Sequence, residues 1–188
     1  YGLSRTFQLL RLYQDMTVLN NVMSGYHTRI PYRFFDAVVG RKKIWDQEKI
    51  IKEEMMDLLS FVGLADYAEL NASELSGGQR RLLVLARAIA MKPKLLMLDE
   101  PAAGLSPVNV DNLMKIIMQL KDKYGLTLII IEHILKVVMD TCNTVTVFDH
   151  GQKIAEGSPQ QVKDDNAVIE AYLGKKMNDE EMRKALAV

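Results

Sequence analysis

An apolar run that ends in two adjacent carboxylates constrains the fold of this chain more than any other feature. Leu95 to Leu98 are four consecutive apolar residues, and Asp99, Glu100 and Pro101 follow directly. An uninterrupted run of this kind is typical of a strand that a parallel sheet buries on both faces. Side chains at the carboxyl end of such a strand face the crevice where open α/β sheets bind ligands. Two solvated acids in a turn are the competing interpretation, which the run and the proline disfavour.

The remaining pattern alternates between helices and strands. Before Ala72 we expect a short strand over 2–8 and helices over 16–23 and 44–62, the last ended by Gly63. After it we expect helices over 77–91 and 107–124, a second buried strand over 126–131, a helix from His133, a strand over 144–148, and short helices over 159–163 and 167–173. The alternation predicts an α/β fold with a parallel sheet from Leu95 onward.

The composition narrows the class of protein. With 188 residues and 48% hydrophobic content, the chain can bury one α/β core. Its 24 basic and 24 acidic residues balance, which argues against a nucleic-acid surface. The single cysteine, Cys142, excludes an internal disulfide framework. No apolar run approaches the ~20 residues of a membrane span. His27 and His150 lack ligand spacing, so no metal site is assigned to them.

Ser76, Gly77 and Gly78 stand where a helical pattern begins. Without a Cβ the backbone can approach a phosphate closely, and the helix dipole favours an anion there. An ordinary capped helix start is the alternative interpretation. Arg80 and Arg81 follow, and we expect them on the helix surface or paired with acids.

Four side chains at strand ends are candidates for nucleotide hydrolysis. Asp99 would reach Mg²⁺, through water, and Glu100 would orient the attacking water or accept its proton. His133 ends the strand expected to run parallel to the first, so it would lie near Glu100 and bond a γ-phosphate or the water. Gln8 ends a short strand, and its amide could contact Mg²⁺ or the water. A surface histidine and a solvated glutamine are the alternatives.

The phosphate-binding half of such a site is not found in the sequence. No G-x-x-x-x-G-K-[ST] loop occurs, and the chain begins at Tyr1 in what reads as the middle of a domain. We therefore expect a fragment that hydrolyses no ATP alone, exposes part of its sheet and aggregates.

Four motifs in order make the chain similar to the nucleotide-binding subunits of ATP-binding cassette (ABC) transporters. Leu75–Gln79 matches the ABC signature letter for letter, and Leu95–Glu100 matches the Walker B strand with its catalytic glutamate. Gln8 matches the Q-loop, and His133 matches the switch histidine. The resemblance covers nearly the whole chain.

Other segments resemble the ATPases of branched-chain amino acid importers. They are Arg5 to Gln8, Met16 to Val22, Ala102 to Pro107, Glu132-His133, and Ala171 to Gly174. Relatives that handle urea, amides or lipopolysaccharide share parts of this pattern. The resemblance thus implies an ATPase that drives uptake of branched-chain or other hydrophobic amino acids, with these relatives as alternatives. Ser106 departs from the aspartate common in ABC proteins.

The resemblance implies a partial P-loop NTPase-like domain: residues 1–8 end the N-terminal core, 9–92 form a helical signature subdomain, 93–174 form the α/β core, and 175–188 form a tail. Two such subunits would sandwich two ATP molecules with Mg²⁺. The partner's ATP would be contacted by Ser76, Gly77, Gly78 and Gln79. The subunit's own ATP would be acted on by Glu100, His133 and Gln8, while Asp99 and Gln8 hold the metal.

The resemblance also implies partners and a location. The ATPase would lie on the cytoplasmic face of the inner membrane, bound to transmembrane permease subunits and served indirectly by an extracytoplasmic solute-binding protein. Residues 9–22 would form a docking groove, or simply a packed helix, and the loop over 102–107 could face the second subunit. A non-transport ABC ATPase is disfavoured because the chain lacks long heptads and basic linkers. A non-enzymatic docking subunit is the third alternative.

Overall fold

The computed structural model describes residues 2–6, 11–26 and 41–173. It comprises two compact units, Tyr1–Ile131 and Glu132–Val188, and each is described by itself. Gln8, His27, the expected loop over 31–40 and the expected tail over 175–188 lie outside the described residues. Among the described helices, none combines the length and apolarity that crossing a membrane requires.

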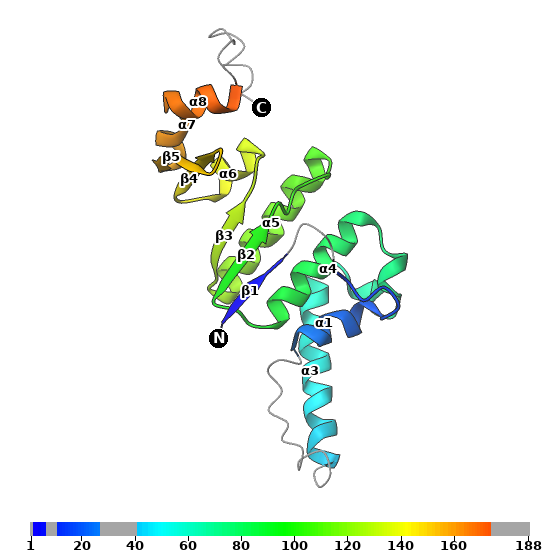
Figure 1. The fold of residues 1–188 in the computed structure, drawn as a ribbon. Helices are drawn as coiled ribbons and strands as arrows, with labels where there is room; N and C mark the ends of the chain where they lie inside the picture. The colour runs from blue at the N-terminus through cyan, green and yellow to red at the C-terminus, as the bar shows by residue number, and fades with distance from the viewer. Residues whose placement is uncertain (1, 7–10, 27–40, 174–188) are drawn as a thin grey trace. The chain divides into compact units, whose positions relative to one another are not determined.

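The first unit contains a parallel sheet of three strands (Figure 1). They are β1 (Leu3–Arg5), β2 (Leu95–Asp99) and β3 (Thr127–Ile131), with β2 in the middle. Leu95 is aligned with Leu3 on one side and Thr127 on the other, so alternate residues of all three strands share a face. The sheet confirms the α/β class and the parallel pairing expected from the sequence.

One face of the sheet is covered. Ser4, Leu96 and Leu98 point to it and are almost completely buried. Helix α5 (Pro107–Tyr124) lies behind the strands in Figure 1. The helix begins at its proline and ends at Gly125, which has the left-handed φ of 62° that glycine tolerates. Both ends agree with the sequence pattern.

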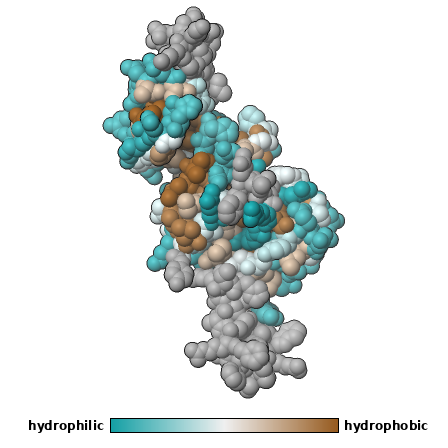
Figure 2. Space-filling view, in the orientation of Figure 1, coloured by the Kyte–Doolittle hydropathy of each residue, from teal (hydrophilic) through white to brown (hydrophobic). Residues whose placement is uncertain are grey.

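The opposite face is apolar and open. Leu3, Ile129 and Ile131 are 53%, 44% and 53% exposed, and Figure 2 shows hydrophobic atoms gathered over the strands. The prediction of a second strand buried on both faces is therefore wrong for β3, whose residues are exposed or only half-buried. An apolar strand sequence indicates that the strand faces favour burial. It does not indicate which other segment packs against each face.

The other elements described in the first unit, over residues 11–26 and 41–131, are helices α1 (Val18–Tyr26), α3 (Arg41–Phe61) and α4 (Gly77–Ala90) and the 3₁₀ turns η2 (Ala65–Tyr67) and η3 (Ala72–Glu74). Thr17 Oγ1 accepts the Asn20 N–H at 3.1 Å and so caps α1. Gly25 allows α1 to approach α4, since a Cβ there would overlap the carbonyl oxygen of Arg87. The two helices therefore pack backbone against backbone.

The second unit is a small α+β cluster. Its elements are α6 (Leu135–Thr141), β4 (Val145–Asp149), β5 (Gln152–Gly157), α7 (Pro159–Lys163) and α8 (Asn166–Leu173). The two strands form an antiparallel hairpin, and Val145, Val162 and Val168 make the core beneath it. The helix expected from His133 begins instead at Leu135, because Ile134 has extended backbone (φ −83°, ψ 104°).

Candidate functional site

Helix α4 begins in a reciprocal cap. Ser76 Oγ accepts the Gln79 N–H at 3.4 Å, and Gln79 Oε1 accepts the Ser76 N–H at 2.9 Å. The Arg80 guanidinium donates to the carbonyl oxygens of Leu75 (2.8 Å) and Ser73 (3.1 Å). These bonds fix the backbone on which the signature residues stand.

The two signature glycines are not required by the chain's own packing. A Cβ built on Gly77 or Gly78 meets no heavy atom within 4 Å, and neither residue has a positive φ. Gly25, by contrast, has its Cβ position blocked by backbone. Bare backbone at an exposed helix N-terminus, without a steric reason inside the unit, suits close approach by an external anion.

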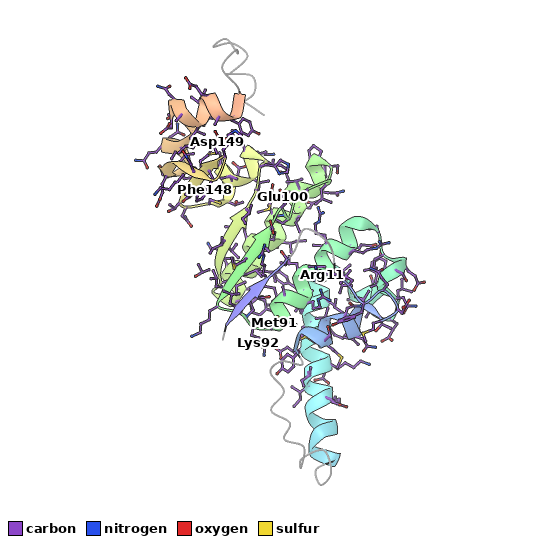
Figure 3. The ribbon with its side chains drawn as sticks, viewed as in Figure 1. Arg11, Met91, Lys92, Glu100, Phe148 and Asp149 are labelled. Atoms are coloured by element: carbon purple, nitrogen blue, oxygen red, sulfur yellow. The ribbon has the colours of Figure 1, made fainter. Side chains whose placement is uncertain are left out.

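The carboxylates follow β2 as the sequence predicted. Asp99 ends the strand and Glu100 comes next, at the carboxyl end of β2 (Figure 3). Glu100 has a left-handed φ of 45°, and its N–H donates to the Ile131 carbonyl at 2.9 Å. Ala103 then donates its N–H to the Glu100 carbonyl at 3.2 Å, which closes a turn around Pro101. The Glu100 backbone is therefore held from both sides in a conformation that non-glycine residues rarely adopt.

Arg5 is a site residue that sequence reasoning did not single out. Its guanidinium lies 2.8 Å from a carboxylate oxygen of Asp99, across the β1–β2 pair. The signal was present in the strand alternation, because Arg5, Met97 and Ile129 are aligned and side chains two residues apart share a face.

Asp99 fits a magnesium site of the kind that works with a nucleotide. Mg²⁺ is often held by one or two carboxylates, waters and substrate phosphates rather than by a full protein cage. Within residues 2–6, 11–26 and 41–173 no cluster of three or more His, Cys, Asp or Glu side chains could hold a metal by itself. A single carboxylate, Asp99, would therefore hold the metal only together with phosphate oxygens and waters.

His133 belongs to the second unit. Glu132 accepts the backbone N–H groups of His133 (3.1 Å) and Ile134 (3.4 Å), and Tyr172 donates its hydroxyl to the His133 carbonyl at 3.3 Å. These contacts orient the His133 backbone. Its expected proximity to Glu100 stays a prediction, since the two residues lie in separately described units.

A cavity of about 660 Å³ adjoins α1 and α4 in the first unit. Arg11, Tyr13 and Arg87 lie on its lining, and the Arg87 guanidinium stands 5.7 Å from the centre of the Tyr13 ring. Burial lowers the pKa of Arg87. Residues 9–22 were expected to form either a docking groove or a packed helix. Within their described part, α1 is largely buried and a cavity lies beside it.

Comparison with known proteins agrees with these motifs. The family profile described as ABC transporter matches residues 2–103, and that of the branched-chain amino acid ATP-binding cassette transporter matches residues 152–176. The high-affinity branched-chain amino acid transport ATP-binding protein BraF of Pseudomonas aeruginosa is 36% identical over 173 residues, covering 92% of this chain and 68% of BraF. The corresponding protein LivG of Escherichia coli is 34% identical with the same coverage.

Solved structures agree as well. An ATP-binding cassette of an ABC transporter in its ADP conformation has a TM-score of 0.74 at 32% identity, covering 93% of this chain and 69% of that one. A nucleotide-free ATP-binding cassette has a TM-score of 0.73 at 34% identity. The matched family profile, the relatives and the shared fold together show that this chain belongs to the ABC transporter family of ATP-binding cassettes.

Proposed function

We propose that this chain is part of the ATP-hydrolysing subunit of a branched-chain amino acid importer. One observation carries the hydrolytic part: Gly77 and Gly78 leave bare backbone at a capped helix start that the unit's own packing does not use. An anion such as the γ-phosphate of ATP is the ligand that this surface favours. The relatives' roles in branched-chain amino acid transport support the solute.

The carboxylates divide the chemistry. Glu100, on a rigid turn, orients the attacking water and accepts its proton. Asp99 would hold Mg²⁺, which would supply positive charge against the phosphates. Gln8 and His133 contact the γ-phosphate, the metal or the water, and Ser76 and Gln79 support the backbone that meets phosphate.

We infer that two copies share each site, with the signature of one facing the nucleotide of the other. The cavity beside α1 and α4 receives a cytoplasmic segment of a permease subunit, so the protein works at the inner face of the membrane with an extracytoplasmic solute-binding protein.

Mixed dimers of the full-length gene product test the sharing of sites. A Glu100→Gln copy paired with a Gly78→Asp copy leaves one intact shared site, so we expect about half of the wild-type ATP turnover. A copy carrying both changes, paired with wild type, leaves no intact shared site and is expected to be inactive. If each copy used its own signature, the two results would be reversed. Turnover that survives Glu100→Gln in both copies would contradict the hydrolytic proposal.

The transported solute needs a separate measurement. Deleting the gene should abolish high-affinity uptake of radiolabelled leucine, and the Glu100→Gln gene should not restore it. Normal leucine uptake with lost urea uptake would favour the urea or amide relatives instead.

A further inference from the structure

Arg81 connects the signature helix to the loop that follows Glu100. It stands one turn into α4, and its guanidinium donates a hydrogen bond to the carbonyl oxygen of Ala103. Ala103 in turn donates its N–H to the Glu100 carbonyl at 3.2 Å. Two hydrogen bonds therefore link the signature helix, through the single residue Ala103, to the backbone of the glutamate.

The surroundings make this connection rigid. Arg81 lines a cavity of about 20 Å³, room for about one water, together with Asp99 and Glu100. Thr6 and Pro101 also line the cavity, as do apolar side chains from α4, β2 and α5: Val84, Leu85, Leu98, Leu113 and Ile117. The arginine stem is thus packed among core residues while its head reaches the loop.

The loop is also shaped by its own backbone. Ala102 is completely buried, Gly104 has a φ of 72°, and Leu105 donates its N–H to the Ala102 carbonyl at 3.2 Å. These two consecutive turns, over residues 100–105, fix the direction in which Glu100 leaves the strand. A guanidinium bond to the carbonyl between them is well placed to set that direction.

We propose that Arg81 is a positioning residue for the hydrolytic reaction: it transmits the placement of the signature helix to Glu100 through the Ala103 carbonyl. The inference rests on the proposed function. Engagement of Ser76 and Gly78 by the partner's nucleotide would then set the glutamate against the water in the same movement. A displacement of a catalytic group by about 1 Å can cost roughly 100-fold in rate.

The test uses the full-length gene product with Arg81→Met, which removes the donors and keeps the apolar stem. We expect kcat for ATP hydrolysis to fall about 10- to 100-fold while KM stays within about twofold. Arg81→Lys, which retains a donor, should recover to within about threefold of wild type. The control is Lys115→Met, which changes an exposed lysine on α5 and should leave kcat unchanged.

Amide hydrogen exchange in the nucleotide-free protein tests the Arg81–Ala103 contact independently of ATP hydrolysis. In Arg81→Met, the Ala103 and Leu105 amides should exchange about 10-fold faster or more, and amides in the middle of α5 should not change. Unchanged exchange at these two amides, unchanged kcat, or an equal loss of kcat in Lys115→Met would overturn the proposal. Absence of ATP turnover in the wild-type protein would instead count against the proposed function, so the two failures are distinguishable.

Discussion

The guanidinium of Arg5 lies 2.8 Å from a carboxylate oxygen of Asp99 and occupies the group that we propose for Mg²⁺. The two side chains are 45% and 25% exposed, so water weakens their attraction. A cation beside the carboxylate nevertheless competes with a metal for the same oxygens and repels it.

Arg5→Met should therefore tighten metal binding. We expect the Mg²⁺ concentration that gives half-maximal ATP turnover to fall about two- to fivefold, the range of a partly exposed ion pair. Mn²⁺ binding followed by electron paramagnetic resonance should shift in the same direction. Arg5→Lys keeps the charge and should stay near wild type. Weaker metal binding in Arg5→Met would show that the arginine organises the site rather than competing for it.

Glu100 has a left-handed backbone, which predicts a stability difference between two inactive variants. Glycine adopts a φ of 45° freely, whereas alanine retains the steric cost of about 1 kcal/mol. The entropy of unfolded glycine offsets part of this cost, so the free energy of unfolding of Glu100→Gly should lie up to about 1 kcal/mol above that of Glu100→Ala. Urea denaturation measures the difference. An alanine variant clearly more stable than the glycine variant would mean that the turn relaxes when the carboxylate is removed.

Two glycines should respond to alanine in opposite ways. Gly25→Ala pushes a methyl group into the Arg87 carbonyl at the α1–α4 contact, and we expect a loss of about 1–3 kcal/mol in the free energy of unfolding. Gly77→Ala meets open space at a helix start, so stability should be unchanged or rise by up to about 1 kcal/mol. The same Gly77→Ala variant should lose ATP turnover if phosphate contacts this backbone. Thermal unfolding and an ATPase assay on the two variants separate packing from function.

Asn21 is completely buried and holds the segment before α1 in place. Its amide donates to the carbonyl oxygens of Tyr13 (2.9 Å), Thr17 (3.1 Å) and Met16 (3.2 Å), and its Oδ1 accepts the Tyr13 N–H at 3.0 Å. Asn21→Ala leaves buried backbone groups unsatisfied, and we expect a loss of about 3 kcal/mol in the free energy of unfolding.

Asn20→Ala is the matched control for this change, because Asn20 is exposed and its side chain makes none of those contacts. It should stay within about 0.5 kcal/mol of wild type in the same denaturation experiment. Equal effects in the two variants would mean that water replaces the Asn21 bonds.

Local signals in the sequence were sufficient for most elements. Pro107 and Gly125 mark the ends of α5, and Ser76 marks the start of α4. Each of these residue types favours a helix end through its own local conformation or hydrogen bonding, without help from distant residues. The strand preceding Asp99 was recognisable for a similar reason: an apolar run before acids has few other structural interpretations.

Features that depend on distant residues were not predictable in the same way. Exposure of part of the sheet was expected from the sequence, but the exposure of β3 in particular was not. The Arg5–Asp99 and Arg81–Ala103 contacts join residues 94 and 22 positions apart. Sequence spacing does not tell which partner a long basic side chain finds. The proposed catalytic roles of Gln8, Glu100 and His133 remain predictions for the assays above.

The open face of the sheet has a consequence for the fate of the chain in a cell. Leu3 on β1 and Ile129 and Ile131 on β3 expose apolar side chains on the two strands that flank β2. Chaperones and proteases continuously triage chains that populate such exposed surfaces. For these 188 residues by themselves, a substitution that exposes more of this face should therefore lower the amount of chain recovered from a cell without touching any catalytic group.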